Sequence, residues 1–252
     1  MPFGHRLHDK VAKRVYLDWF LMCMIAGHVN AGGFLSCERF VTHVTGFATL
    51  AGVDFYQGKW FDALAVLSIP VYFLLGVMLS AYLTEKHFVH KVHGNRFAPV
   101  LWIVGVLLLG AGVLGYNNYF GEFGKSAVLH QDYILLALLC GASGLQNAAI
   151  SSASGYTVRT THLTGITTDL GIGIIRYFSH HMGQSEKEKE YLATKVRALT
   201  ILSFVFGSTV GAYSYFNFKY LGFLLPAIAA FYVAFMASRG MGRQSKASDQ
   251  AM

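Results

Sequence analysis

The chain has 252 residues, of which 54% are hydrophobic and only 13% are charged, with a formal net charge of +7. Soluble domains carry about 25% charged residues, so this composition excludes an ordinary soluble protein. The basic residues gather in short loops and tails, a pattern that sets orientation in a membrane rather than one that binds nucleic acid. We therefore predict an all-α polytopic membrane protein that forms a single domain over 1–252.

Long apolar stretches give the predicted spans, because a helix needs about 20 residues to cross a bilayer. In chain order, the expected spans are 15–36, 61–83, 99–116, 132–154, 198–215 and 220–237. Basic tails are expected at 1–14 and 238–252, and a charged linker at 179–197.

Two polar segments, 38–60 and 155–177, lie between predicted spans and share a motif. The first contains VTHVTG at 41–46, and the second contains TTHLTG at 160–165. Both motifs are polar and lie next to strongly apolar sequence. The sequence thus presents the same unusual stretch once in each half of the chain.

The match between the halves continues on both sides of this motif. The matched blocks are 27–31 (GHVNA) with 144–148 (GLQNA), and 76–82 (GVMLSAY) with 207–213 (GSTVGAY). Three blocks in the same order predict an internal duplication, with repeat one at about 15–116 and repeat two at about 132–237. The small residues Gly76, Ser80, Gly207 and Gly211 are expected at helix contacts.

The placement of Lys and Arg distinguishes two topologies. If each polar segment crosses the membrane, there are eight spans, and the basic loop 84–98 lies opposite the amino terminus, against the positive-inside rule. If each segment enters and returns on one side, there are six spans, and every basic segment is cytoplasmic. We therefore predict six transmembrane helices plus two re-entrant or broken helical segments, with both termini cytoplasmic. A tilted, full-length helix with an unwound centre stays the alternative for each polar segment.

The six-span topology has a consequence for symmetry. Each half then contains an odd number of spans, so the second repeat is inverted relative to the first. Inverted repeats with broken helices near the midplane recur in channels and secondary transporters. The predicted fold is therefore an inverted internal repeat.

The GHVNA block with the Thr45-Gly46 turn, and GLQN at 144–147 with the segment 159–171, resemble the YoaK-like family of bacterial inner-membrane proteins. The resemblance covers about 18–235. The family often has Asp where this chain has Asn30, and Thr-Gly-Asn where 45–47 reads TGF. The resemblance implies six spans and a multi-pass location in the bacterial inner membrane, and it implies no activity.

Polar side chains at membrane depth are functional hypotheses. His43 and His162 occupy matched positions, and a histidine pair can move protons or sense pH near neutrality. A half-helix beginning at each motif would direct its positive end at the site, which suits an anion. Arg159 adds a full charge, which Asp169 is expected to neutralise in an empty site. The predicted substrate-binding residues are Asn30, Thr42, His43, Thr45, Gly46, Gln146, Asn147, Arg159, Thr161, His162, Thr164, Gly165 and Asp169.

The sequence thus favours a transporter or channel for a small anionic or weak-acid solute, with proton coupling through histidine. The alternative is a membrane-embedded metal-binding protein or enzyme that uses His28, His43 and His162. A buried, purely hydrogen-bonded role for the histidine pair also stays open. No nucleotide-binding loop or hydrolase motif occurs, so we lean against an enzyme and expect no cofactor. The expected partners are the lipid bilayer and a small solute, and a homo-oligomer stays open.

Overall fold

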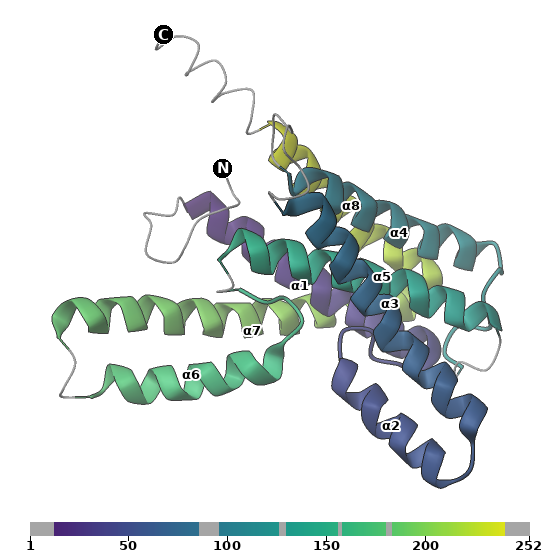
Figure 1. The fold of residues 1–252 in the computed structure, drawn as a ribbon. Helices are drawn as coiled ribbons and strands as arrows, with labels where there is room; N and C mark the ends of the chain where they lie inside the picture. The colour runs from purple at the N-terminus through teal and green to yellow at the C-terminus, as the bar shows by residue number, and fades with distance from the viewer. Residues whose placement is uncertain (1–12, 86–95, 126–129, 156–157, 180–182, 240–252) are drawn as a thin grey trace.

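The computed structural model describes residues 13–85, 96–125, 130–155, 158–179 and 183–239. Within these residues the chain is all-helical and contains no strand (Figure 1), which confirms the predicted class. The helices are α1 (Lys13–Cys37), α2 (Val44–Tyr56), α3 (Trp60–Thr84), α4 (Ala98–Tyr116), α5 (His130–Ala153), α6 (Leu163–Tyr177), α7 (Gln184–Phe218), the 3-10 helix η1 (Lys219–Phe223) and α8 (Leu224–Arg239). Most of the predicted tails 1–14 and 238–252, and most of the basic loop 84–98, lie outside the described residues.

Among the residues that the structure describes, five stretches are long and apolar enough to cross a membrane. They are Tyr16–Cys37, Trp60–Thr84, Ala98–Tyr116, Gln131–Ala153 and Gln184–Arg239. The last stretch has 56 residues and contains α7, η1 and α8. By contrast, α2 has 13 residues and α6 has 15, too few for a helix that needs about 20 to span. Six crossings and an inverted repeat stay predictions.

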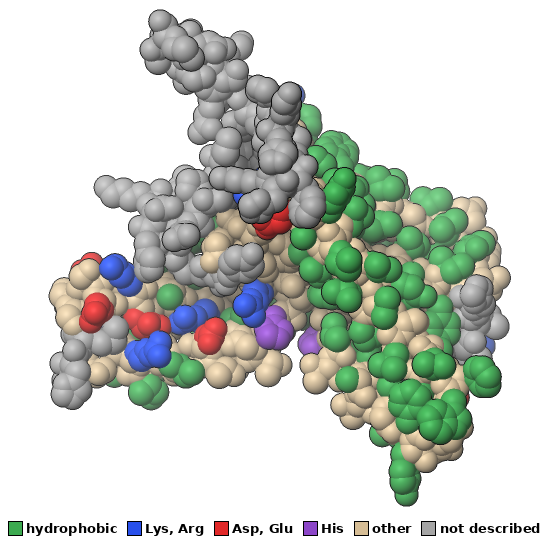
Figure 2. All heavy atoms as spheres, viewed as in Figure 1, with side chains coloured by type: hydrophobic (Ala, Val, Ile, Leu, Met, Phe, Trp, Pro, Cys, Tyr) green, Lys and Arg blue, Asp and Glu red, His purple; other side chains and the backbone are tan. Residues whose placement is uncertain are grey.

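The surface agrees with a protein that meets lipid. Large apolar side chains are exposed along α3, and Phe61 at its start is 89% exposed. Figure 2 shows hydrophobic side chains covering much of the face formed by α2, α3 and α4. Soluble monomers rarely expose continuous apolar patches of such extent.

Two pairs of helices, α1 with α7 and α3 with α5, cross closely, and both crossings depend on glycine. A Cβ added at Gly27 of α1 would collide with the backbone of α7 at Phe204, and one added at Gly144 of α5 would collide with the backbone of α3 at Phe73. From the other side, Gly207 meets Met24 and Gly76 meets Gly141. Small residues let helix backbones approach closely. The expected contact role of the small residues is confirmed.

These two crossings are equivalent under the sequence matching. Gly27 matches Gly144, and Gly207 matches Gly76. The pair α1–α7 therefore corresponds to the pair α5–α3, so that each crossing joins one half of the chain to the other. The two halves are interleaved rather than stacked as separate units.

One predicted boundary is wrong. The segment 179–197 was expected to be a charged linker, but α7 begins at Gln184 and continues without a break to Phe218. Glu and Lys are good helix formers, and the Glu186 carboxylate accepts a hydrogen bond from the N–H of Gly183. Arg197 also pairs with Glu190 at 2.8 Å, beside Gly173 of α6. The charged sequence therefore extends a helix that α6 packs against.

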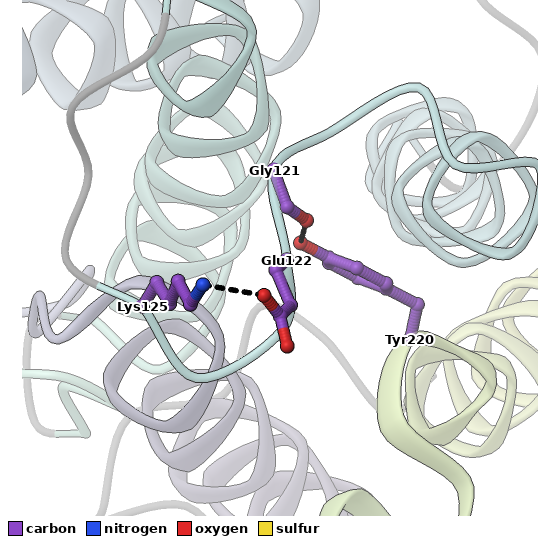
Figure 3. Close-up of polar contacts among 4 residues, drawn as sticks. All are labelled: Gly121, Glu122, Lys125 and Tyr220. Carbon is purple, nitrogen blue, oxygen red and sulfur yellow. Dashed lines mark hydrogen bonds and ion pairs between the residues drawn. The ribbon is translucent and has the colours of Figure 1, made fainter.

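The connection between α4 and α5 is fastened to η1 (Figure 3). The Tyr220 hydroxyl donates a hydrogen bond to the carbonyl of Gly121 at 2.7 Å, and the N–H of Gly121 donates to Asp132 at 3.1 Å. Lys125 and Glu122 form an ion pair at 2.5 Å, and the hydrogen bond from Lys125, together with its positive charge, lowers the pKa of the Glu122 carboxyl. Because this pair is exposed to solvent, it adds little stability.

Candidate functional site

The first motif is folded back against α1. After Cys37 the chain turns, and the N–H of Arg39 bonds to the carbonyl of Gly33. Thr42 then lies beside Asn30, whose side-chain oxygen accepts hydrogen bonds from the Thr42 hydroxyl at 2.9 Å and from the Thr42 N–H at 3.3 Å. This contact brings the chain back about two turns along α1, and α2 begins directly afterwards with His43 as its N-cap.

The second motif is built in a similar way after α5. The Ser154 hydroxyl accepts a hydrogen bond from the N–H of Val158 at 2.9 Å, which closes the turn. The Thr160 hydroxyl donates to the side-chain oxygen of Asn147 at 3.4 Å. His162 is then the N-cap of α6. In both halves, an asparagine on the preceding helix thus holds the segment that leads into a short helix.

Both motifs line one cavity of about 1180 Å³. Its lining comes from the N-terminal ends of α2 and α6, one face of α3 and the carboxyl-terminal part of α5. The lining residues are Phe40, Thr42, His43, Val44, Thr45, Gly46, Phe73, Val77, Ala81, Thr84, Glu85, Asn147, Ala148, Ser151, Ser152, Arg159, Thr161, His162, Leu163, Thr164 and Gly165. In Figure 2, histidine side chains lie on both sides of the cleft that separates the α6–α7 end from the α2–α3 end.

The cavity brings together ten of the thirteen predicted site residues. These are Thr42, His43, Thr45, Gly46, Asn147, Arg159, Thr161, His162, Thr164 and Gly165. Three residues do not line it. Asn30 is buried beneath Thr42, and Gln146 donates a hydrogen bond to the carbonyl of Met22 on α1 at 2.6 Å. Asp169 lies on the exposed surface of α6, well beyond the first turn.

The positive charge of Arg159 is turned toward the second motif. Its guanidinium lies 3.4 Å from Nδ1 of His162. A guanidinium only donates, so Nδ1 is the acceptor in this contact, and a neutral His162 then carries its proton on Nε2. The expected partner is wrong: Arg159 forms no ion pair with Asp169 or with any other described residue. The chain turns before α6 begins at Leu163, and Asp169 lies within this continuous helix on its exposed surface.

The histidine of the first motif has a different setting. Its Nδ1 lies 3.2 Å from the Thr42 hydroxyl, and its ring meets Phe40 edge-on, with ring centroids 5.7 Å apart. Phe40 in turn stacks on Phe34, with centroids 4.7 Å apart. The first motif therefore offers an aromatic side chain where the second offers Arg159.

The alternative metal site does not form. His28 is buried in α1, where its Nε2 lies 3.1 Å from the carbonyl of Gly222 and 3.2 Å from the Ser214 hydroxyl. It does not line the cavity that contains His43 and His162. Among the described residues, no group of three or more His, Cys, Asp or Glu side chains could hold a metal ion. His28 is instead a packing residue that joins α1 to α7 and η1.

Sequence reasoning missed the wall of the cavity that α3 contributes. Phe73, Val77 and Ala81 recur every four residues and form one face of the helix, and Glu85 follows at its end. On α5, Ser151 comes one turn after Asn147 on the same face. Because residues four apart lie on the same face of a helix, the position of Asn147 would have been enough to predict Ser151 as a cavity residue from the sequence. The α3 face gives no such signal, because apolar residues surround that helix on all sides.

The ends of two helices give the cavity its electrostatic character. The first N–H groups of a helix lack intrahelical partners and carry partial positive charge. Neither α2 nor α6 has a side-chain cap on these groups, and the first residues of both helices line the cavity. Arg159 adds a full positive charge beside these helix ends, and Glu85 at the end of α3 adds a carboxylate to the same lining.

A comparison with protein families finds a match over most of the chain. A family model described as "Protein of unknown function (DUF1275)" matches residues 19–236. No curated protein and no solved structure shows a significant match to the chain. The match covers both halves of the molecule, both motifs and the cavity between them. The chain therefore belongs to the DUF1275 family.

Proposed function

We propose that this protein is a membrane transporter or channel for a small anionic or weak-acid solute. One observation carries the proposal: two half-length helices, one from each half of the chain, begin at the same cavity. Broken helices whose ends meet at a shared site are how transporters expose backbone groups to a solute at membrane depth. Irregular backbone at that depth is tolerated where it lines a cavity.

The equivalent crossings support an inverted repeat. The first helix of each half packs on the third helix of the other, α1 on α7 and α5 on α3, as expected when the two halves are related by a pseudo-two-fold axis. We infer six spans, with α7 and α8 crossing separately and α2 and α6 re-entering from opposite sides. Both termini then lie in the cytoplasm of a bacterial inner membrane, where the basic loop 84–98 also belongs.

The same topology has a direct test. Single cysteines placed at Asn118 and at Gly94 are expected to react with a membrane-impermeant reagent from opposite sides, with Gly94 cytoplasmic. The native cysteines, Cys23, Cys37 and Cys140, are all buried, so background labelling is low. Labelling of both sites from one side would rule out the six-span arrangement.

The proposed selectivity rests on charge. Arg159 and the two helix ends present hydrogen-bond donors and positive potential to the cavity. Histidine changes charge near neutral pH, so a proton on His43 or His162 would add positive charge beside the anion. Proton coupling through these side chains is part of the proposal.

Transport itself is tested with the purified protein in proteoliposomes. An inward gradient of an anion such as nitrate or acetate is applied, and internal pH and anion are followed with fluorescent reporters. The proposal expects flux above that of empty liposomes, with anions preferred to cations. Equal leakage of anions and cations, or none above empty liposomes, would exclude an anion pathway.

A further inference from the structure

The cavity has two walls of opposite chemistry. One wall carries hydrogen-bond donors and comes from α5 and from the segment that leads into α6. The other wall is apolar and comes from α3. Because these walls face the same space of about 1180 Å³, a ligand that fills the cavity meets both.

The donor wall contains hydroxyls that have nothing to bind within the protein. Thr161 and Ser151 both line the cavity, and neither hydroxyl forms a hydrogen bond to another residue in the described part of the chain. Asn147 uses its oxygen to accept from Thr160, which leaves its NH₂ group free. Arg159 adds a guanidinium with no ion-pair partner in the described part of the chain. These hydroxyl, amide and guanidinium groups are free to donate to a molecule in the cavity, so this wall suits a ligand rich in acceptors.

The apolar wall is formed mainly by one face of α3. Phe73, Val77 and Ala81 lie on one face of α3, and Val44 at the start of α2 extends this surface. Of the residues that α3 contributes, only Thr84 and Glu85 at its carboxyl end are polar. The Thr84 hydroxyl is already satisfied by the carbonyl of Ser80. Most of the wall therefore offers a ligand contact area without hydrogen bonds.

An inorganic anion would use only half of this site. Enclosed sites for drug-sized molecules are typically about 300–1000 Å³, and this cavity is at least as large. A small ion at the donor wall would leave water against Phe73 and Val77. A ligand with an apolar body would displace that water, and each methylene buried in this way strengthens binding about fourfold.

We propose that the cavity binds an amphipathic anion, with a carboxylate or phosphate head at the donor wall and an apolar body along α3. This inference rests on the proposed anion pathway and names its substrate class. A soluble organic acid and an anionic lipid share this chemistry, and the experiment distinguishes them.

The test uses the full-length protein in phosphatidylcholine nanodiscs. Acetate, butanoate, hexanoate and octanoate are titrated while intrinsic fluorescence is followed, with empty nanodiscs and the matching alcohols as controls for partition into lipid. Affinity is expected to rise about fourfold per methylene until the apolar wall is covered. The alcohols, which lack the anionic head, are expected to bind at least tenfold more weakly than the acids.

Substitutions in each wall test which side chains bind the apolar body of the ligand and which bind its anionic head. Val77→Ser is expected to flatten the dependence of affinity on chain length, whereas Arg159→Gln is expected to weaken all four acids by the same factor. Val106→Ser, at an exposed position of α4 outside the cavity, is the matched control and keeps the full dependence. If Val77→Ser does not fold, Ala81→Ser provides the same test.

The outcomes separate this inference from the proposed function. Phosphatidylglycerol that competes with octanoate identifies a lipid source, and competition by short organic acids alone identifies a soluble one. Equal affinity for acetate and octanoate overturns the amphipathic substrate and leaves an anion pathway standing. Failure of every anion to bind overturns the proposed function itself.

Discussion

The two motifs are built alike and differ in charge. Each begins with an asparagine on the preceding helix, continues through a histidine N-cap, and enters a short helix. In the first turn, the Thr49 hydroxyl bonds to the carbonyl of Thr45, and the Thr168 hydroxyl bonds to that of Thr164. The backbone of the site is thus supplied twice by the same sequence pattern.

The two motifs differ at the position that precedes their shared segment, which is 40 in the first half and 159 in the second. Position 40 is a phenylalanine that stacks on Phe34, whereas position 159 is an exposed arginine that contacts His162. The surroundings differ in the same sense, because Figure 2 shows charged side chains over the α6–α7 end and apolar ones over the α2–α3 end. The comparison teaches that the matched sequence supplies two helix ends, while the second motif alone supplies a positively charged side chain.

The largest expected effect is on stability and tests the glycine crossings that the two halves share. Gly144→Val and Gly27→Val each place a side chain against a backbone carbonyl of the facing helix. We expect each to lower the free energy of unfolding by about 3 kcal/mol, the upper end of overpacking costs, as read from thermal unfolding in detergent. Gly110→Val is the control, because an added Cβ there meets nothing within 4 Å. If only one of the two variants is destabilised, the crossings are not equivalent.

The next effect tests the difference in charge. Arg159→Gln removes a charged donor from the cavity, and hydrogen bonds to charged groups contribute about 1.5–3 kcal/mol. Anion flux in proteoliposomes is therefore expected to fall at least tenfold, with the thermal midpoint unchanged. Phe40→Leu, at the matched position, is expected to keep its flux. Normal flux together with a lowered midpoint would instead make Arg159 a structural residue.

The two asparagines allow a finer comparison. Asn30→Ala leaves the N–H of Thr42 without an acceptor in a buried place and removes the 2.9 Å hydrogen bond of its hydroxyl, and we expect a loss of about 1–3 kcal/mol in stability. Asn147→Ala removes one long contact in a half-buried place, so its cost in stability is expected to stay below about 1 kcal/mol. Chemical denaturation of both variants in detergent measures the difference. Equal losses would contradict the distinction between a supporting Asn30 and a cavity-lining Asn147.

The smallest effect concerns pH. A proton on His162 adds positive charge beside Arg159 in an exposed setting, where two charges about 4 Å apart interact by about 1 kcal/mol. Anion affinity is thus expected to be up to about fivefold higher when His162 carries this proton than when it does not. Binding titrations of His162→Gln should show a flatter pH profile, and His43→Gln a smaller change. A profile that neither variant alters would assign the proton to Glu85, the carboxylate that lines the cavity.

The sequence by itself determined the class of this protein and the location of its unusual features. Apolar stretches long enough to span a membrane, together with few charges, already exclude a soluble fold. The duplication also identified the small residues at the helix crossings, because only glycine allows backbones to approach so closely at Gly27 and Gly144. Ten of the predicted site residues line one cavity for the same reason: matched sequence in two halves folds into matched structure.

The tertiary structure alone decided which polar residues face the cavity. Asn30 and Asn147 match in sequence, yet one is buried under Thr42 and the other lines the cavity. His28 and Gln146 are polar residues in apolar helices, and their partners, Gly222 and Met22, lie far away in the chain. The face that α3 turns to the cavity depends on how it crosses α5. A helix that is apolar on all sides carries no periodic signal for that choice, so packing had to settle it.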